Sequence, residues 1–164
     1  MKMAGSKDKR YIYGMRIIVV PVVVLLDQIT KAIISHRLNL NQTIGVMAGF
    51  FNIVYIKNPG AAFGLFRGWG SMRGIFLVIV TLLALIIIIY IYRKTTERLL
   101  RFSLSLIAGG AIGNLIDRVR LGEVVDFLDF YIGKYHWPAF NIADSAITVG
   151  VFIAVVELYF KKPN

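Results

Sequence analysis

The sequence contains no cysteine and only two histidines. Without cysteine, the chain cannot form a disulfide, a thiolate metal site or a cysteine nucleophile. There is no His-Glu-x-x-His motif, which argues against a zinc peptidase. His36 and His136 have no obvious serine or metal-ligand partner, so we expect surface or interfacial positions for both and no Ser-His triad. Ser145 adjoins Asp144 without a nucleophile-elbow pattern, which disfavours a serine–lysine dyad with Lys31.

Hydrophobic residues make up 57% of the chain, above the roughly 45–50% usual for soluble domains. They gather in four runs, each near the ~20 residues that a helix needs to cross a bilayer. We predict a membrane α-helical protein with transmembrane helices over residues 15–34, 75–92, 99–116 and 142–160. A single integral membrane domain (15–164) would then follow a polar, basic leader (1–14). The first run lacks a small-residue cleavage site, so we expect a mature helix and not a signal peptide.

Acidic residues are few, nine against nineteen Lys and Arg, for a net charge of +10. Because the basic residues flank the apolar runs, membrane topology explains them better than a nucleic-acid partner. The positive-inside rule places both termini in the cytoplasm. The residues on which this depends are Lys2, Lys7, Lys9, Arg10, Arg16, Arg93, Lys94, Arg98, Arg101, Lys161 and Lys162.

Residues 38–69 have the composition of an extracytoplasmic cap rather than of a span. Phe51–Ile56 is rich in β-branched and aromatic residues, and Asn58-Pro59-Gly60 is typical of a turn. We predict a small strand-rich cap whose Phe51–Ile56 stretch binds an extended peptide by edge pairing. In the third run, Ser105, Gly109 and Gly113 recur every four residues, which predicts close helix packing.

Ionisable residues inside the runs need a partner or a task, because each costs about 2.5–3.5 kcal/mol at the centre of a bilayer. Asp27 and Lys31 are four residues apart on one helix face and could form an ion pair that simply anchors the helix. Asn114 and Asp117 share a face at the end of the third run. Arg118 beside them could make a forked bond to a carboxylate, or merely complete a salt-bridged helix end.

Asp126 and Asp144 are the candidates for chemistry. Asp126 lies among apolar residues that suggest a segment pressed against the membrane, where its carboxylate would be desolvated. Asp144 stands in the first turn of the fourth run, and Asn141 three residues earlier gives the spacing of a capping box, which is the structural alternative. Two carboxylates brought close together cannot both ionise cheaply, so one can act as acid while the other activates water.

Five blocks of sequence, in this order, resemble the lipoprotein signal peptidases, also called signal peptidase II, an aspartic peptidase family of the bacterial inner membrane. They are Asp27–Lys31, Asn58–Phe63, Gly113–Arg118, Val124–Phe127 and Phe140–Ser145. The resemblance implies removal of the signal peptide from diacylglyceryl-modified prolipoproteins, on the amino side of the lipidated cysteine. The active site would lie near the extracytoplasmic surface.

The resemblance also implies roles for individual residues. Asp126 and Asp144 would be the catalytic dyad. Substrate binding or support of the dyad would fall to Asn58, Asn114, Arg118 and Asn141, and a structural or supporting role to Asp27, Lys31 and Asp117. The family needs no metal or organic cofactor, acts in contact with membrane lipid, and is the target of cyclic peptide antibiotics.

Two other functions fit the same residues less well. Intramembrane Asp, Asn and Arg also mark ion pathways, but here the acids gather at one side instead of forming a chain across the bilayer. A scaffold whose polar residues only hold helices together would tolerate Asp126→Asn.

Overall fold

Residues 5–60 and 72–160 are described in the computed structural model, with side chains of the first helix described from Ile18 onward. The leader's first four residues, residues 61–69 of the predicted cap and the terminal Lys161 and Lys162 lie outside this part of the chain. The elements are α1 (Gly5–Arg37), β1 (Thr43–Met47), β2 (Phe51–Asn58), α2 (Met72–Lys94), α3 (Arg98–Leu121), β3 (Val124–Ile132), β4 (Tyr135–His136) and α4 (Ile142–Phe160).

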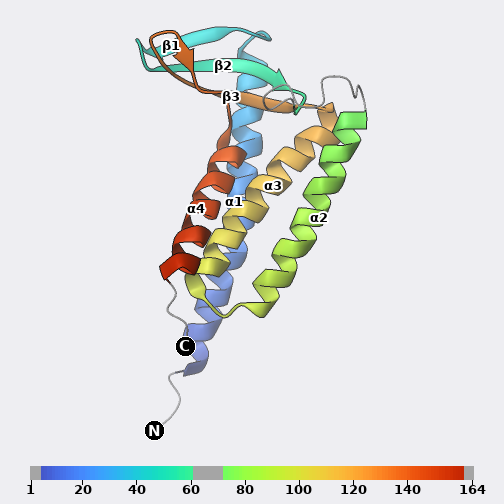
Figure 1. The fold of residues 1–164 in the computed structure, drawn as a ribbon, viewed down its shortest axis with the longest axis vertical. Coiled ribbons are helices and arrows are strands. Elements are labelled where there is room, and N and C mark those ends of the chain that lie inside the picture. The colour runs from blue at the N-terminus through green and yellow to red at the C-terminus, as the bar shows by residue number, and fades with distance from the viewer. Residues whose placement is uncertain (1–4, 61–71, 161–164) are drawn as a thin grey trace.

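Within the described residues, four helices are long and apolar enough to cross a membrane, as the sequence predicts. They run side by side, with an antiparallel sheet across one end (Figure 1). The helices extend beyond the apolar runs: α1 already begins at Gly5, and α3 continues past Ile116 to Leu121. Hydropathy marks where lipid contact ends, whereas α3 ends only where Gly122 adopts a left-handed φ of 75° and donates its N–H to the Arg118 carbonyl.

Small residues bring α3 close to its neighbours, as their spacing predicts. A Cβ on Gly109 would lie 2.8 Å from Cβ of Val23 on α1, and one on Gly113 would lie 2.6 Å from Oδ2 of Asp27. The contact with α4 uses glycines outside the Ser105, Gly109 and Gly113 repeat. A Cβ on Gly150 would lie 2.8 Å from the Ser103 carbonyl oxygen, and one on Gly110 would collide with the Ala143 carbonyl oxygen.

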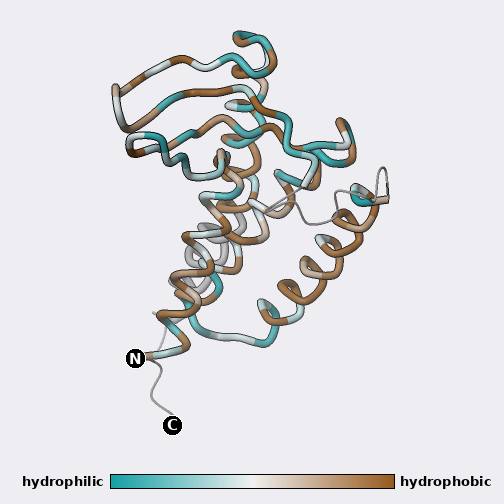
Figure 2. Tube along the Cα trace, turned by 45° about the horizontal axis from the view of Figure 1, so that its top comes forward, coloured by the Kyte–Doolittle hydropathy of each residue, from teal (hydrophilic) through white to brown (hydrophobic). Residues whose placement is uncertain are grey.

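The outward helix surfaces are apolar, as a bilayer requires. Figure 2 shows hydrophobic residues along most of α2, between hydrophilic ends, and no residue of this helix is buried. Large side chains such as Leu25, Ile86 and Phe152 are more than half exposed. In α3, by contrast, the buried residues are mostly small or polar, which concentrates the polar contacts between helices instead of toward lipid.

The cap is a sheet of order β1-β2-β3-β4, antiparallel throughout. β1 and β2 lie in the predicted cap, but β3 and β4 come from the segment between α3 and α4, which was interpreted only as pressed against the membrane. β2 is paired on both sides, since Ile53 faces Ile44 and also Leu128. The prediction that Phe51–Ile56 offers a free edge is therefore wrong for most of that stretch.

Candidate active site

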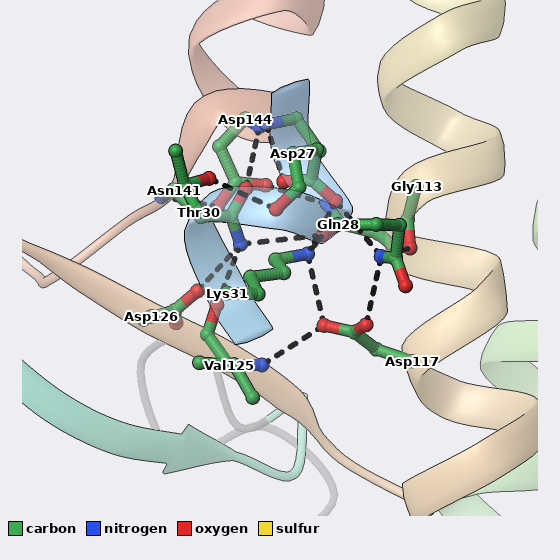
Figure 3. Close-up of polar contacts among 12 residues, drawn as sticks. Asp27, Gln28, Thr30, Lys31, Gly113, Asp117, Val125, Asp126, Asn141 and Asp144 are labelled. Atoms are coloured by element: carbon green, nitrogen blue, oxygen red, sulfur yellow. Dashed lines mark hydrogen bonds and ion pairs between the residues drawn. The ribbon is translucent and has the colours of Figure 1, made fainter. Parts of the chain in front are cut away.

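The polar residues predicted to carry chemistry meet where the helices reach the sheet. Asp126 comes from β3, and Asp144 comes from the first turn of α4 (Figure 3). In the β2–β3 register, Asn58 pairs with Val124 and Ile56 with Asp126, which brings Asn58 to the site. Long-range strand pairing and helix packing thus join residues from β2, β3 and α4.

Asp126 is only 2% exposed and accepts two amide hydrogen bonds. Its Oδ1 accepts from Asn141 Nδ2 at 2.7 Å, and its Oδ2 accepts from Asn58 Nδ2 at 2.9 Å. Burial raises the pKa of Asp126 from 3.8 to about 6, and the neighbouring charge of Asp144 adds to this against the opposing effect of the two amides. A carboxyl with this pKa can exchange a proton near neutral pH.

Asp144 is half-buried, and both of its oxygens accept hydrogen bonds. Asn114 Nδ2 donates to Oδ1 at 2.7 Å, and the Asn141 backbone N–H donates to Oδ2 at 3.3 Å. In return the Asp144 N–H donates to Asn141 Oδ1 at 2.9 Å. The capping box weighed as a structural alternative is therefore present, and it is part of the same network as the candidate dyad.

Asn141 links the two aspartates directly. Because its Oδ1 accepts the Asp144 N–H, its amide nitrogen must point the other way, toward Asp126 and Asn114. Asn141 is completely buried. Its orientation follows from the donors and acceptors around it, so the residue can hold one aspartate from each of two elements in a fixed relation.

Beneath this pair lies a buried ion cluster. Lys31 Nζ is 2.9 Å from Asp27 Oδ2 and 2.9 Å from Asp117 Oδ2, and it donates to Asn114 Oδ1 at 3.0 Å. Gln28 adds a second bridge between the two carboxylates, with Nε2 at 3.1 Å from Asp27 and 3.0 Å from Asp117. No role was predicted for Gln28, because a neutral residue within an apolar run gives no electrostatic signal.

Arg118 does not make the forked bond that its position suggested. Its side chain forms no hydrogen bond or ion pair with any residue that the structure describes. It is half-buried at the end of α3 and is close enough to Asp144, Asp126 and Asp117 to attract them electrostatically. Successive helix residues point about 100° apart, so Asp117 can contact Lys31 while Arg118 points elsewhere.

The serine–lysine dyad loses its geometric basis. Ser145 Oγ donates to the Asn141 carbonyl oxygen at 2.9 Å, while Lys31 is engaged by three other acceptors, so the two do not form a dyad. His136 is half-exposed, in agreement with the expected surface position. It nevertheless has a side-chain partner, because its Nδ1 lies 2.8 Å from Asp129 Oδ1. Among the described side chains, residues 18–60 and 72–160, no group of acidic residues and histidines is arranged to hold a metal ion.

The fold and the site define a class. A bundle of four membrane helices carries two aspartates, from separate elements and bridged by one asparagine, at one end of the bundle. This is the arrangement of a membrane-embedded enzyme with a paired-carboxylate site.

Comparisons with known proteins identify the family within this class. A sequence model of signal peptidase (SPase) II matches residues 19–160. The lipoprotein signal peptidase of Desulforapulum autotrophicum is 51% identical over 144 residues, covering 86% of this chain and 89% of the relative. That of Syntrophus aciditrophicus is 50% identical over 143 residues, covering 85% and 89%. A solved bacterial membrane enzyme matches with a TM-score of 0.81 at 38% identity, over 91% of this chain and 95% of that one. The chain belongs to the signal peptidase II family of aspartic peptidases.

Proposed function

We propose that this enzyme removes the signal peptide from diacylglyceryl-modified prolipoproteins, cutting on the amino side of the lipidated cysteine with water activated by Asp126 and Asp144. The observation that carries the proposal is the pair of aspartates on separate elements, bridged by Asn141 and placed at the end of the helices under the sheet. Family membership supplies the reaction class, and the geometry supplies residues that can perform it.

In the proposed mechanism the dyad carries one proton. The ionised aspartate takes a proton from a water molecule, whose oxygen attacks the scissile carbonyl carbon. The protonated aspartate then gives its proton to the amide nitrogen, and the C–N bond breaks to leave a carboxylate on the signal peptide and an amine on the lipidated cysteine. Because the two carboxyls share one proton in this proposal, the pair, rather than either residue, carries the acid and base functions.

Three residues support this chemistry in the proposal. Asn58 and Asn114 each donate an amide hydrogen bond to one dyad aspartate and so restrict its rotation. Arg118 has a positive charge near both dyad aspartates and no hydrogen-bond partner in the described residues. Its guanidinium can therefore donate to a substrate carbonyl and offset the negative charge that develops there.

The substrate contacts follow from the surroundings of the site. Within the described residues, Ile56–Asn58 pair with β3 but not with β1, beside Asp126. An extended precursor can hydrogen-bond along this remaining edge, which is a shorter binding strand than the sequence suggested. The apolar outer faces of the helices let the diacylglyceryl chains and the signal peptide stay in lipid while the scissile bond reaches the dyad.

We further propose that the enzyme lies in the cytoplasmic membrane with both termini on the cytoplasmic side. The α2–α3 connection and the start of α1 share the end of the bundle remote from the sheet (Figure 1). Arg93, Lys94, Arg98 and Arg101 flank the α2–α3 connection. The positive-inside rule assigns this end to the cytoplasm. The site then faces the side on which an exported precursor is exposed.

Sensitivity to cyclic peptide antibiotics is part of the same proposal. A cyclic peptide that inserts a hydrogen-bonding group between Asp126 and Asp144 would displace the attacking water. Such a compound is expected to compete with the lipidated precursor, which steady-state inhibition kinetics measures directly.

The function is tested by incubating the purified protein in lipid with a diacylglyceryl-modified precursor and with the same precursor lacking the lipid. We expect cleavage of the lipidated form alone, with the new amino terminus at the modified cysteine by mass spectrometry. Equal cleavage of both forms would contradict lipid recognition. No cleavage of either form by folded wild-type protein would contradict the proposed peptidase activity. That result would favour the ion-pathway interpretation instead.

A further inference from the structure

The ion cluster beneath the dyad has contacts that its own stability does not require. Lys31 is buried, with its side chain only 4% exposed, and the three N–H groups of its ammonium can be matched to three acceptors: Asp27 and Asp117 at 2.9 Å each and Asn114 at 3.0 Å. The acceptors come from both α1 and α3. We call Asp27, Lys31 and Asp117 the lysine cluster.

Each carboxylate of the lysine cluster holds the backbone immediately before one dyad aspartate. Asp27 Oδ1 accepts the N–H of Ala143, which precedes Asp144, at 3.0 Å. Asp117 Oδ2 accepts the N–H of Val125, which precedes Asp126, at 3.1 Å. Figure 3 shows Lys31 between the two carboxylates, with Val125 bonded to Asp117.

The Asn114 side chain forms a third connection, between Lys31 and Asp144. Lys31 can only donate, so Asn114 must present its amide oxygen to the ammonium and its amide nitrogen to the other side. That nitrogen donates to Asp144 Oδ1 at 2.7 Å. Lys31 therefore helps to fix which end of Asn114 faces the dyad, together with Asn141 Nδ2, which donates to the same oxygen at 3.2 Å. In the opposite amide orientation, the Asn114 oxygen would face the Asp144 carboxylate, which is itself an acceptor.

We propose that the lysine cluster is a positioning device that sets the spacing and orientation of Asp126 and Asp144 through the Ala143 and Val125 amides and the Asn114 side chain. The inference rests on the proposed function, in which these two aspartates are the dyad. Buried ion clusters contribute little net stability, because apolar replacements are often as stable. The contacts with Ala143 and Val125 therefore point to alignment rather than to general packing.

The alignment of the two aspartates should have a large effect on the rate of this reaction. Both carboxyls must reach one water molecule and the scissile bond, and a misplacement of about 1 Å can cost on the order of 10²-fold in rate. The lysine cluster does not need to touch the substrate to have this effect. Its loss should lower kcat and leave KM nearly unchanged, since the residues proposed to bind substrate remain in place.

The test compares Asp117→Asn with Asp129→Asn, which is a matched control. Both aspartates are buried, at 4% and 7% exposure, and both accept hydrogen bonds from neighbouring side chains. Asp129, however, contacts Asn52 and His136 in the cap and has no bond to the dyad network. Lys31→Arg is the second variant, because it keeps the charge but cannot reproduce the compact three-way contact of an ammonium.

We expect Asp117→Asn and Lys31→Arg to lower kcat about 10- to 100-fold, with KM within about threefold of wild type and active protein quantified by its folded fraction. Asp129→Asn should retain kcat within about twofold. The proposal is overturned if Asp117→Asn and Lys31→Arg match Asp129→Asn in kcat, or if they change KM and not kcat. If either Asp117→Asn or Lys31→Arg does not fold, the kcat and KM of the other variant decide between these outcomes.

Asp126→Asn, measured in the same assay, separates this inference from the proposed function. If Asp126→Asn cleaves normally, the dyad assignment itself is wrong. If it is inactive while Asp117→Asn and Lys31→Arg are fully active, the dyad assignment survives and only the positioning role of the lysine cluster is wrong.

Discussion

At the scale of single residues, burial and hydrogen bonding act on Asp126 in opposite directions. Its carboxylate is almost fully buried, which disfavours the charged form, while Asn58 and Asn141 donate to it and favour that form. Burial dominates, and the pKa rises from 3.8 to about 6. Keeping this buried carboxylate ionised at neutral pH costs folding free energy. Active sites commonly contain such perturbed groups because their chemistry requires them.

The pH dependence of stability should reveal this cost. The folded protein holds a proton on Asp126 up to about pH 6, whereas the unfolded chain releases it near 3.8. The stabilisation is therefore fully present below the unfolded pKa and is lost as pH rises through about 6, by about 3 kcal/mol at most.

Thermal unfolding in detergent between pH 4 and 7 measures this loss. We expect wild-type stability to fall across this range relative to Asp126→Asn, whose side chain does not titrate. Parallel curves for the two proteins would show that the pKa of Asp126 is not raised.

The sequence could predict most of the site at this scale, because an ionisable group in an apolar run stands out. Asp27, Lys31 and Asp144 stand out on that ground, and Asp126 stands out because its neighbours outside the runs are also apolar. Gln28 was not assigned a role, since a neutral amide has no comparable cost. The partner of His136 was also missed, because Asp129 lies seven residues away and approaches only when β3 and β4 pair.

At the scale of elements, the helices were predictable and half of the sheet was not. A bilayer requires about 20 apolar residues in each span, which leaves a long local signal. Strand pairing leaves a much weaker signal, because Asp126 is brought alongside Ile56, 70 positions earlier in the chain. The residues around Asp126 therefore indicate that the segment is buried, but not which strand it pairs with.

Glycine at the α3–α4 contact should be necessary for the position of Asp144. A Cβ on Gly110 would collide with the Ala143 carbonyl oxygen and lie 2.7 Å from Ile147 Cγ1. We expect Gly110→Ala to destabilise the protein by about 1–3 kcal/mol despite the better helix propensity of alanine, as measured by thermal unfolding.

Gly74→Ala in α2 is the control, because the nearest contact of its Cβ among the described residues outside its own helix turn would be the Gly122 carbonyl oxygen at 3.9 Å. This variant should be neutral or slightly stabilising. Equal stability of the two variants would contradict the close packing of α3 against α4.

At the scale of the whole molecule, the protein places polar chemistry at one end of an apolar bundle. The exposed faces of the helices are hydrophobic, and the charged residues of the site are enclosed by α1, α3, α4 and β3. Charge distribution along the chain predicts which end faces the cytoplasm. This orientation stays a prediction.

The absence of cysteine makes the orientation simple to measure. Single cysteines at Thr96, in the α2–α3 connection, and at Lys134, beside β4, would each be the only thiol in the chain. Both positions are exposed. In intact spheroplasts, a membrane-impermeant maleimide should label Lys134→Cys and leave Thr96→Cys unlabelled until the membrane is opened. The reverse pattern would invert the proposed topology.

The central claim is that Asp126 and Asp144 act as one catalytic unit, and a double-mutant cycle tests it most directly. Cleavage of the lipidated precursor is measured for Asp126→Asn, Asp144→Asn and the double variant, each checked for folding. We expect each single variant to lose at least about 10²–10⁴-fold in kcat, with no further loss in the double variant, because residues acting as a unit are strongly non-additive. Substantial activity in either single variant, or additive losses in the double variant, would contradict the account.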